Sequence, residues 1–146
     1  MTLDWTLACS ACGATATAEG LPTLCPECGQ PWLVRYQRAM PDVKVRAEVR
    51  RGQGMWRFRP LLPIAPAETP VTLGEGDTPL LPLPRIGAEY GIPDLWLKDE
   101  GANPTGSFKS RGMSAAITRA VAAGATRFVV PTAGNAGVAL AANQGL

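Results

Sequence analysis

Four cysteines near the N-terminus have a spacing that suits a metal ion. Cys9 and Cys12 form one Cys-x-x-Cys pair, and Cys25 and Cys28 form a second pair after twelve intervening residues. A glycine directly follows each pair, which permits a tight turn whose backbone amides point at the sulfur atoms. Two such turns supply the four tetrahedral sulfur ligands that zinc prefers. The spacing therefore predicts a structural zinc ribbon with no open coordination position.

Two disulfides and a redox-active Cys-x-x-Cys remain as alternatives to zinc. The gap between the pairs is slightly shorter than in many paired zinc motifs. Disulfides fit less well because the chain opens without the charged and apolar leader of a secreted protein. A redox pair fits less well because neither pair lies beside a predicted strand–helix unit.

A lysine is the second candidate for chemistry, because the chain has no histidine and only three lysines, Lys44, Lys98 and Lys109. Without histidine, a Ser-His-Asp triad, a Cys-His pair and any His-containing metal site are excluded within this chain. Lys109 falls in the first turn of a predicted helix, where the positive helix end favours the uncharged amine. An uncharged lysine is the nucleophile that Schiff-base chemistry requires.

A second loop of small residues, Thr-Ala-Gly-Asn-Ala at 132–136, precedes another predicted helix. Free backbone amides at a helix start bind a carboxylate or a phosphate. The side-chain amide of Asn135 is able to hydrogen-bond a ligand hydroxyl. From spacing alone, a solvated lysine at 109 and an ordinary turn at Gly134 are equally good interpretations.

Both loops are expected to be positioned by alternating strands and helices. Residues 95–98 predict an apolar strand, 103–106 a turn, and Ser107 the cap of a helix that runs to about Ala123 and ends at Gly124. Residues 128–130 predict a second strand, followed by an Ala-rich helix through Ala142. This order predicts an α/β fold with a right-handed β-α-β unit of a parallel sheet, whose carboxyl edge carries both loops.

The composition of the 146 residues changes along the chain and divides it into three pieces. We predict a zinc ribbon over 1–35, a basic and proline-rich connector with a short helix over 36–72, and an α/β region over 73–146. No apolar run reaches the length of a membrane helix, and the net charge is only +2. We therefore expect a cytoplasmic protein with no membrane partner.

The connector is the strongest evidence for a function other than catalysis. Residues 35–59 contain eight basic residues and two acidic ones, and a zinc ribbon beside a basic stretch is typical of nucleic-acid-binding modules. Apart from Trp56 and Phe58, the stretch lacks the interleaved aromatic residues of single-strand binders. A solvated connector whose short helix starts at Pro41-Asp42 explains it equally well, and we expect no nucleic-acid partner.

Several motifs resemble those of the threonine synthases, which belong to the tryptophan-synthase-β-like, fold type II group of pyridoxal phosphate enzymes. The most specific is Asn-Pro-Thr-Gly-Ser-Phe-Lys-Ser-Arg at 103–111. The others are Leu-Gly-Glu-Gly-Asp-Thr-Pro-Leu at 73–80, Leu-Lys-Asp-Glu at 97–100 and Pro-Thr-Ala-Gly-Asn-Ala-Gly at 131–137. The cysteine head and the segment 54–63 resemble threonine synthases with an N-terminal zinc ribbon.

The resemblance implies roles for residues of both loops. Lys109 matches the catalytic lysine that forms the covalent link with the cofactor aldehyde, and Asn135 matches the asparagine that hydrogen-bonds the pyridine-ring hydroxyl. The loop whose amides hold the substrate carboxylate matches Thr132, Ala133, Gly134, Asn135 and Ala136. Many relatives have hydroxyl residues at 133 and 136, so alanine removes side-chain contacts there but keeps the amides.

The implied activity is that of a lyase that converts O-phospho-L-homoserine and water to L-threonine and phosphate. Serine/threonine dehydratases and cysteate synthase share the Ser-x-Lys loop and are the alternatives. The implied cofactors are pyridoxal phosphate and a structural zinc ion, and the implied partner is a phosphorylated amino acid. An oligomer is possible in a full-length enzyme.

The family's glycine-rich phosphate loop and the hydroxyl residue that faces the pyridine nitrogen are expected beyond Leu146. We therefore expect these residues to be the N-terminal part of a longer enzyme, with the start of a parallel-sheet domain. As an isolated chain, they are expected to be inactive.

Overall fold

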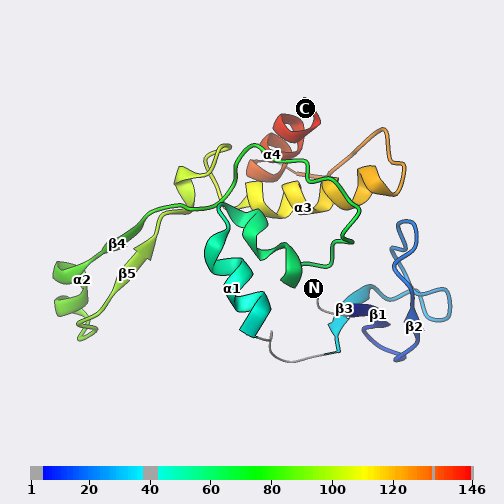
Figure 1. The fold of residues 1–146 in the computed structure, drawn as a ribbon, viewed down its shortest axis with the longest axis horizontal. Helices are drawn as coiled ribbons and strands as arrows, with labels where there is room; N and C mark the ends of the chain where they lie inside the picture. The colour runs from blue at the N-terminus through cyan, green and yellow to red at the C-terminus, as the bar shows by residue number, and fades with distance from the viewer. Residues whose placement is uncertain (1–4, 38–42, 133, 146) are drawn as a thin grey trace.

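Three groups of elements follow one another along the longest axis of the molecule (Figure 1). The computed structural model describes residues 5–37, 43–132 and 134–145. A small sheet lies at the N-terminal end, a protruding hairpin lies at the opposite end, and helices lie between them (Figure 1). The fold is mixed α/β, as expected, but its strands and helices do not alternate in one sheet.

The N-terminal sheet is antiparallel, and β1 forms its centre. Its strands, in the order β2-β1-β3, are β2 (Thr15–Ala16), β1 (Trp5–Cys9) and β3 (Trp32–Tyr36). Leu7 of β1 lies opposite Ala16 on one side and Val34 on the other, and it is buried. The sheet therefore holds the chain on both sides of the first cysteine pair.

Two tight turns place the cysteine pairs. The backbone N–H groups of Cys9 and Cys25 donate to carbonyl oxygens five residues later, each at 2.8 Å. Gly13 and Gly29 have φ values of +76° and +71°, a backbone conformation that glycine adopts without strain. The glycine after each pair therefore has the turning role that its position in the sequence predicts.

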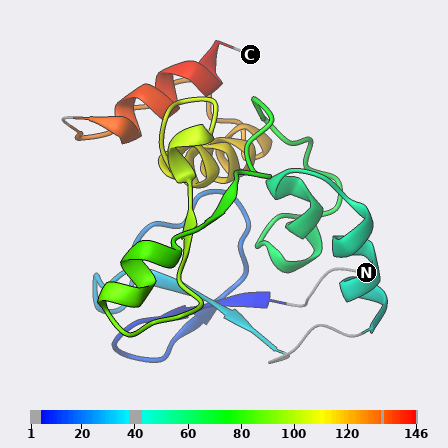
Figure 2. The same cartoon turned by 90° about the vertical axis from the view of Figure 1, so that its left-hand side faces the viewer.

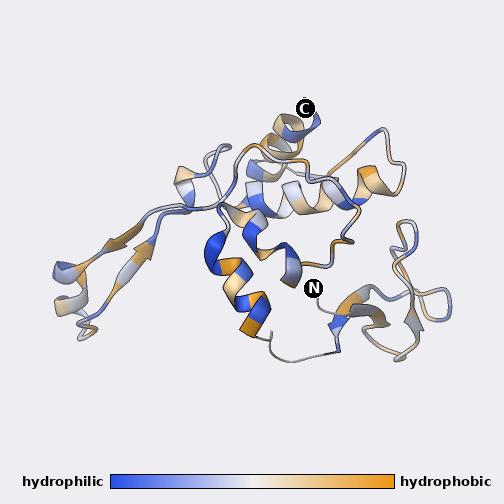
Figure 3. Cartoon of the chain, in the orientation of Figure 1, coloured by the Kyte–Doolittle hydropathy of each residue, from blue (hydrophilic) through white to orange (hydrophobic). Residues whose placement is uncertain are grey.

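The connector contains α1 (Val43–Arg51) and a 3-10 helix, η1 (Met55–Leu61). Apolar and hydrophilic residues alternate along α1 (Figure 3), and Val45 is buried. The short helix predicted here is confirmed, although its expected start at Pro41-Asp42 lies outside the described residues.

The protruding arm is an antiparallel hairpin that carries a short helix. Its elements are β4 (Leu80–Pro82), α2 (Pro84–Glu89) and β5 (Trp96–Lys98), and η2 (Glu100–Ala102) follows it. Leu81 lies opposite Leu97 in the register. The strand predicted at 95–98 is thus confirmed over Trp96–Lys98, and its hydrogen-bonded neighbour is β4.

Helix α3 (Lys109–Ala122) agrees with the predicted helix except at its start. Phe108 is the cap residue, whereas the sequence favours Ser107 for that position. The Ser107 hydroxyl nevertheless accepts the N–H of Lys109 at 3.3 Å. At the other end, the N–H groups of Gly124 and Ala125 bond the carbonyls of Val121 and Ala120, each at 2.9 Å. This Schellman arrangement ends the helix at Gly124 as predicted.

Helix α4 (Asn135–Gln144) packs against α3, and Figure 2 shows it lying across that helix. The predicted parallel sheet is wrong for the described residues, since every strand pair there is antiparallel. Residues 128–130 have no strand structure, and Val129 is 96% exposed. An apolar run suits a strand only where a neighbouring strand accepts its hydrogen bonds, and the described chain offers none there.

The buried residues lie mainly where the connector meets α3 and α4. Apolar members include Ile64, Ile117 and Ala139. Ser114 and Thr118 of α3 are also buried, and both hydroxyls bond the backbone of Val71. Ser114 donates to the carbonyl of Val71 at 2.6 Å, and Thr118 accepts the N–H of Val71 at 2.9 Å. None of the helices in the described ranges is long and apolar enough to cross a membrane.

Candidate functional site

The four cysteines predicted as metal ligands converge on one point. Their Sγ atoms all lie within 4.8 Å of one another. Two of the separations are 3.3 Å, between Cys9 and Cys28, and 3.7 Å, between Cys12 and Cys25. Sulfur atoms that share a tetrahedral zinc ion lie about 3.8 Å apart, given a Zn–S distance of about 2.3 Å. The cluster therefore has the dimensions of a four-sulfur zinc site.

All four thiols are free, which disfavours the two-disulfide alternative. Cys9 and Cys25 are buried, and Cys12 and Cys28 are exposed at the surface. The backbone N–H of Ala11 donates to the sulfur of Cys9 and lowers the pKa of that thiol to about 6. The amide of Ala14 lowers the pKa of Cys12, but the hydrogen bonds shared with Cys9 and Cys28 outweigh it and raise that pKa to about 12. The turn amide of Ala11 thus favours the thiolate form of Cys9, the form in which a cysteine binds a metal ion.

Lys109 lies at the start of α3 with its side chain exposed. Its Nζ atom lies 4.4 Å from the centroid of the Phe108 ring, a cation–π contact. In residues 5–37, 43–132 and 134–145, no carboxylate pairs with this amine. The amine is therefore accessible to a carbonyl compound that approaches α3.

A turn and two buried serines hold the backbone before Lys109. The N–H of Gly106 donates to the carbonyl of Asn103 at 2.8 Å, which confirms the turn predicted at 103–106. The hydroxyl of Ser110 bonds the hydroxyl of Thr105 and accepts its N–H at 3.3 Å. Ser107 and Ser110 are buried on one side of the segment, while Lys109 faces the other.

Glu100 links this segment to the hairpin, although sequence reasoning assigned it no role. Arg111 of α3 donates to both carboxylate oxygens, at 2.7 Å and 2.8 Å. Thr78 donates to the same carboxylate at 3.0 Å, and so does the side-chain amide of Asn103. The Arg111 guanidinium lowers the pKa of Glu100 to about 2, so the carboxylate is ionised at neutral pH. Glu100 and Arg111 both lie in the sequence motifs at 97–100 and 103–111. Residue types alone do not reveal that these two charged side chains form a pair.

The loop over 73–77 lies directly against the connector. The carbonyl of Glu75 accepts the N–H of Met55 at 2.6 Å, and Asp77 accepts the N–H of Gly54 at 2.6 Å. Asp77 has a φ of +48° and also pairs with Arg57 at 3.3 Å. These contacts hold the loop in place, and the loop leads directly into β4 of the hairpin.

The second predicted loop lies at the N-terminus of α4. The hydroxyl of Thr132 accepts the N–H of Gly134 at 3.3 Å, and Asn135 is the first residue of the helix. The N–H groups of Asn135 and Ala136, in the first helical turn, have no intrahelical acceptor and are able to bind an anion. Ala133, also predicted to hold the substrate carboxylate, lies outside the described residues.

The two loops belong to helices that pack on each other, but no hydrogen bond joins the residues of the two loops that the structure describes. Within the described part of the chain, no bond connects Lys109 to Thr132, Gly134, Asn135 or Ala136. Each loop is formed separately, and their joint action on one ligand stays a prediction.

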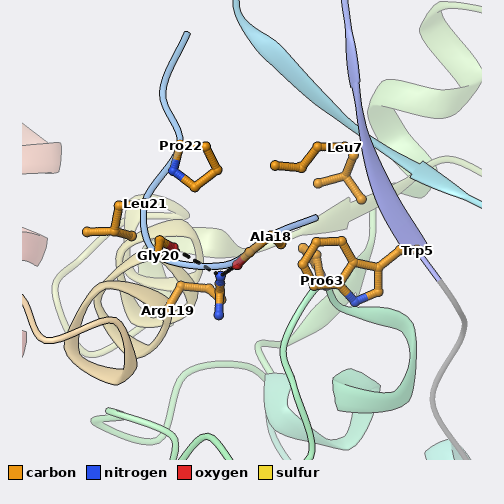
Figure 4. A pocket seen from close by; sticks show the side chains of 9 residues that line it. Trp5, Leu7, Ala18, Gly20, Leu21, Pro22, Pro63 and Arg119 are labelled. Carbon is orange, nitrogen blue, oxygen red and sulfur yellow. Dashed lines mark hydrogen bonds between the residues drawn. The ribbon is translucent and has the colours of Figure 1, made fainter. Parts of the chain in front are cut away.

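A cavity of about 180 Å³ lies between the N-terminal sheet and α3. Apolar side chains line most of it, among them Trp5, Leu7 and Pro63 (Figure 4). Arg119 of α3 donates at its rim to the carbonyls of Ala18 and Gly20 (Figure 4). A second hydrogen bond joins the N-terminal sheet to the connector: the hydroxyl of Tyr36 in β3 donates to the carbonyl of Leu61 in η1 at 2.8 Å.

The chain is similar to known proteins over most of its length. Residues 71–143 match the family described as "Pyridoxal-phosphate dependent enzyme". A threonine synthase of Methanosarcina acetivorans is 34% identical over 135 residues, and one of Methanocaldococcus jannaschii is 38% identical over 136 residues. A threonine synthase of Mycobacterium leprae is 46% identical over 85 residues, which cover 58% of this chain and 23% of the relative. No solved structure matches the chain.

Each of the two archaeal matches covers 92% of this chain and 33% of the relative. The chain thus spans about a third of the length of these curated relatives. Because 92% of the chain is aligned, each match includes most of the cysteine region as well as the loop that carries Lys109. The match to the Mycobacterium leprae protein is shorter and covers 58% of this chain.

Proposed function

This chain belongs to the family of pyridoxal-phosphate dependent enzymes, and on that premise we propose that it supplies the lysine part of a threonine synthase-type site. The proposed reaction converts O-phospho-L-homoserine and water to L-threonine and phosphate. One observation carries the proposal: the exposed amine of Lys109 lies at the start of α3, inside the family match, and Arg111 of the same helical turn is held by Glu100.

The donor set around Lys109 fits the cofactor. The amine is exposed and lies beside the Phe108 ring, and in the described ranges it forms no ion pair with a carboxylate. The buried Ser107 and Ser110 keep its backbone in place. When bound, pyridoxal phosphate supplies the electron sink that makes the substrate Cα proton acidic.

Lys109 is then the base of the proposed reaction. Its amine takes a proton from Cα of the substrate and then one from Cβ. The bond from Cγ to the phosphate oxygen breaks, the hydroxyl of water is added at Cβ, and protons return to Cα and Cγ. Because the chain contains no histidine, no imidazole of this chain competes for these proton transfers.

The start of α4 is the proposed site for the substrate carboxylate. The free amides of Asn135 and Ala136 and the positive end of the helix favour an anion there. The side chain of Asn135 is exposed at the same helix end and is proposed to hydrogen-bond the ring hydroxyl of the cofactor. Thr132 holds the preceding turn through Gly134.

The cysteine cluster is proposed to bind a structural zinc ion. Four sulfur ligands leave no position for water, so the ion stabilises the N-terminal sheet and takes no part in the reaction. The sheet contacts α3 through Arg119 and the connector through Tyr36.

Covalent trapping tests the cofactor assignment. The chain is mixed with pyridoxal phosphate, reduced with borohydride and digested, and the labelled peptide is identified by mass spectrometry. We expect the label at Lys109 and its loss in Lys109→Ala, with Lys44→Ala as the matched control. Equal or greater labelling at Lys44 or Lys98 would overturn the assignment.

A competition experiment tests the substrate class. An amino acid that occupies the cofactor lowers the label trapped at Lys109. We expect O-phospho-L-homoserine to compete at lower concentrations than L-homoserine, L-serine or L-threonine. If L-serine or L-threonine competes equally well, a dehydratase-type substrate replaces the proposed one.

A further inference from the structure

We infer that Glu100 is a positioning residue for Lys109, because its carboxylate holds the chain on both sides of that lysine. The inference rests on the proposed function, in which Lys109 binds the cofactor. Glu100 itself lies in η2, outside the loop and outside α3.

The first tether precedes the lysine. The side-chain amide of Asn103 donates to the carboxylate of Glu100 at 3.0 Å and to its backbone carbonyl at 2.9 Å. Asn103 is 4% exposed, and its carbonyl begins the turn that leads into α3. Its side-chain oxygen also accepts the N–H of Gly76 at 3.2 Å, which joins the loop over 73–77 to the same point.

The second tether follows the lysine. Arg111 meets Glu100 through two parallel N–H···O bonds, a fork geometry that fixes direction as well as distance. Lys109 and Arg111 are two residues apart on one helix, so their side chains leave the axis about 200° apart. With Arg111 held against Glu100, the first turn of α3 cannot rotate, and Lys109 must face the open side.

Thr78, two residues before β4, completes the cluster. Its hydroxyl donates to Glu100 at 3.0 Å and accepts from Arg111 at 3.2 Å. The carbonyl of Thr78 also accepts from the Nζ atom of Lys98. The carboxylate therefore ties together the segment that enters the hairpin, the turn and α3, and Lys109 lies between two of these tethers.

The carboxylate of Glu100 stays ionised at neutral pH. Arg111 lowers the pKa of Glu100 to about 2, and the pKa of Arg111 is raised by the same hydrogen bonds. Both partners are therefore charged at neutral pH.

The inference is tested with Glu100→Gln, which keeps the size of the side chain but removes its charge. The matched control is Glu89→Gln, the same change at an exposed carboxylate of α2. Two quantities are measured on the full chain. One is the ratio of borohydride-trapped pyridoxal phosphate at Lys109 to that at Lys44, a lysine of α1 outside the Glu100 cluster, and the other is amide hydrogen exchange of residues 103–111 without cofactor.

Glu100→Gln is expected to lower the labelling ratio about tenfold and to speed exchange in 103–111 by a similar factor, because charge-assisted bonds are lost. Zinc content and exchange in the N-terminal sheet are expected to stay unchanged, which separates positioning from general unfolding. Glu100→Asp, which retains the charge, is expected to recover part of the ratio.

If Glu100→Gln leaves both the labelling ratio and the exchange rates unchanged, the positioning role of Glu100 is overturned, and the proposed function is unaffected. Absence of selective labelling at Lys109 in the unaltered chain would instead overturn the proposed function. If Glu100→Gln does not fold, Arg111→Lys is measured in the same way, since it keeps the charge and loses the fork. A ratio equal to that of Glu89→Gln would then count against the inference.

Discussion

Arg119 of α3 donates a hydrogen bond to the backbone carbonyl of Ala18, which lies between the two cysteine pairs. The same guanidinium pairs with Glu68, whose side chain is only 7% exposed. One side chain therefore links the N-terminal sheet, the connector and the helix that begins with Lys109. Without it, the cavity shown in Figure 4 would lose its polar rim.

Arg119→Ala is expected to destabilise the chain by about 2–3 kcal/mol, because it leaves the buried carboxylate of Glu68 without its partner. Urea unfolding followed by tryptophan fluorescence measures the loss. Arg85→Ala, a change at an exposed arginine of α2, is the control and should cost less than about 0.5 kcal/mol. Equal losses for both variants would show that the Arg119 contacts contribute nothing.

Purified chain is expected to contain one zinc ion, held by the four cysteines that form the only such group found in the described residues. Elemental analysis measures the metal. Cys25→Ser should reduce zinc content sharply, since Cys25 is a buried member of the group, whereas Ser10→Ala should leave it unchanged. Disulfides without metal after reducing purification would contradict the prediction.

Gly76→Ala is expected to destabilise the chain by more than about 2 kcal/mol. Its φ is +106°, and an added Cβ would lie 2.3 Å from the backbone nitrogen of Met55. Gly112→Ala is the matched control, because an added Cβ there meets nothing within 4 Å. Within α3, where alanine is the better helix former, that change should stabilise by up to about 1 kcal/mol. Thermal unfolding distinguishes the two, and a shift of the same sign would refute the packing described at Gly76.

The ion pair of Glu100 predicts a dependence of stability on acid. The pKa of Glu100 falls from 4.5 to about 2 on folding, so the unfolded chain binds the proton more tightly. The stabilisation from this ion pair is complete above pH 4.5 and is lost as pH falls towards 2. Unfolding measured between pH 2 and 5 should show a smaller loss in Glu100→Gln than in the unaltered chain. Parallel curves would contradict the assignment.

Local features of this protein follow from the sequence because neighbouring residues produce them. The spacing of the cysteines and the glycine after each pair predict two turns that converge, and the structure confirms one cluster. The end of α3 at Gly124 and the turn at 103–106 also depend only on nearby backbone groups. The family resemblance rests on such short motifs, and residues 71–143 match that family.

Contacts between distant residues were decided by the tertiary structure. The sequence predicts that strands at 95–98 and 128–130 share one parallel sheet, but β5 pairs with β4 in an antiparallel hairpin and 128–130 form no strand. The pairing of Glu100 with Arg111 is equally invisible in residue types, since many charged residues offer partners. Hydrogen bonds and ion pairs depend on distance in space, and only the folded chain brings these groups within reach of each other.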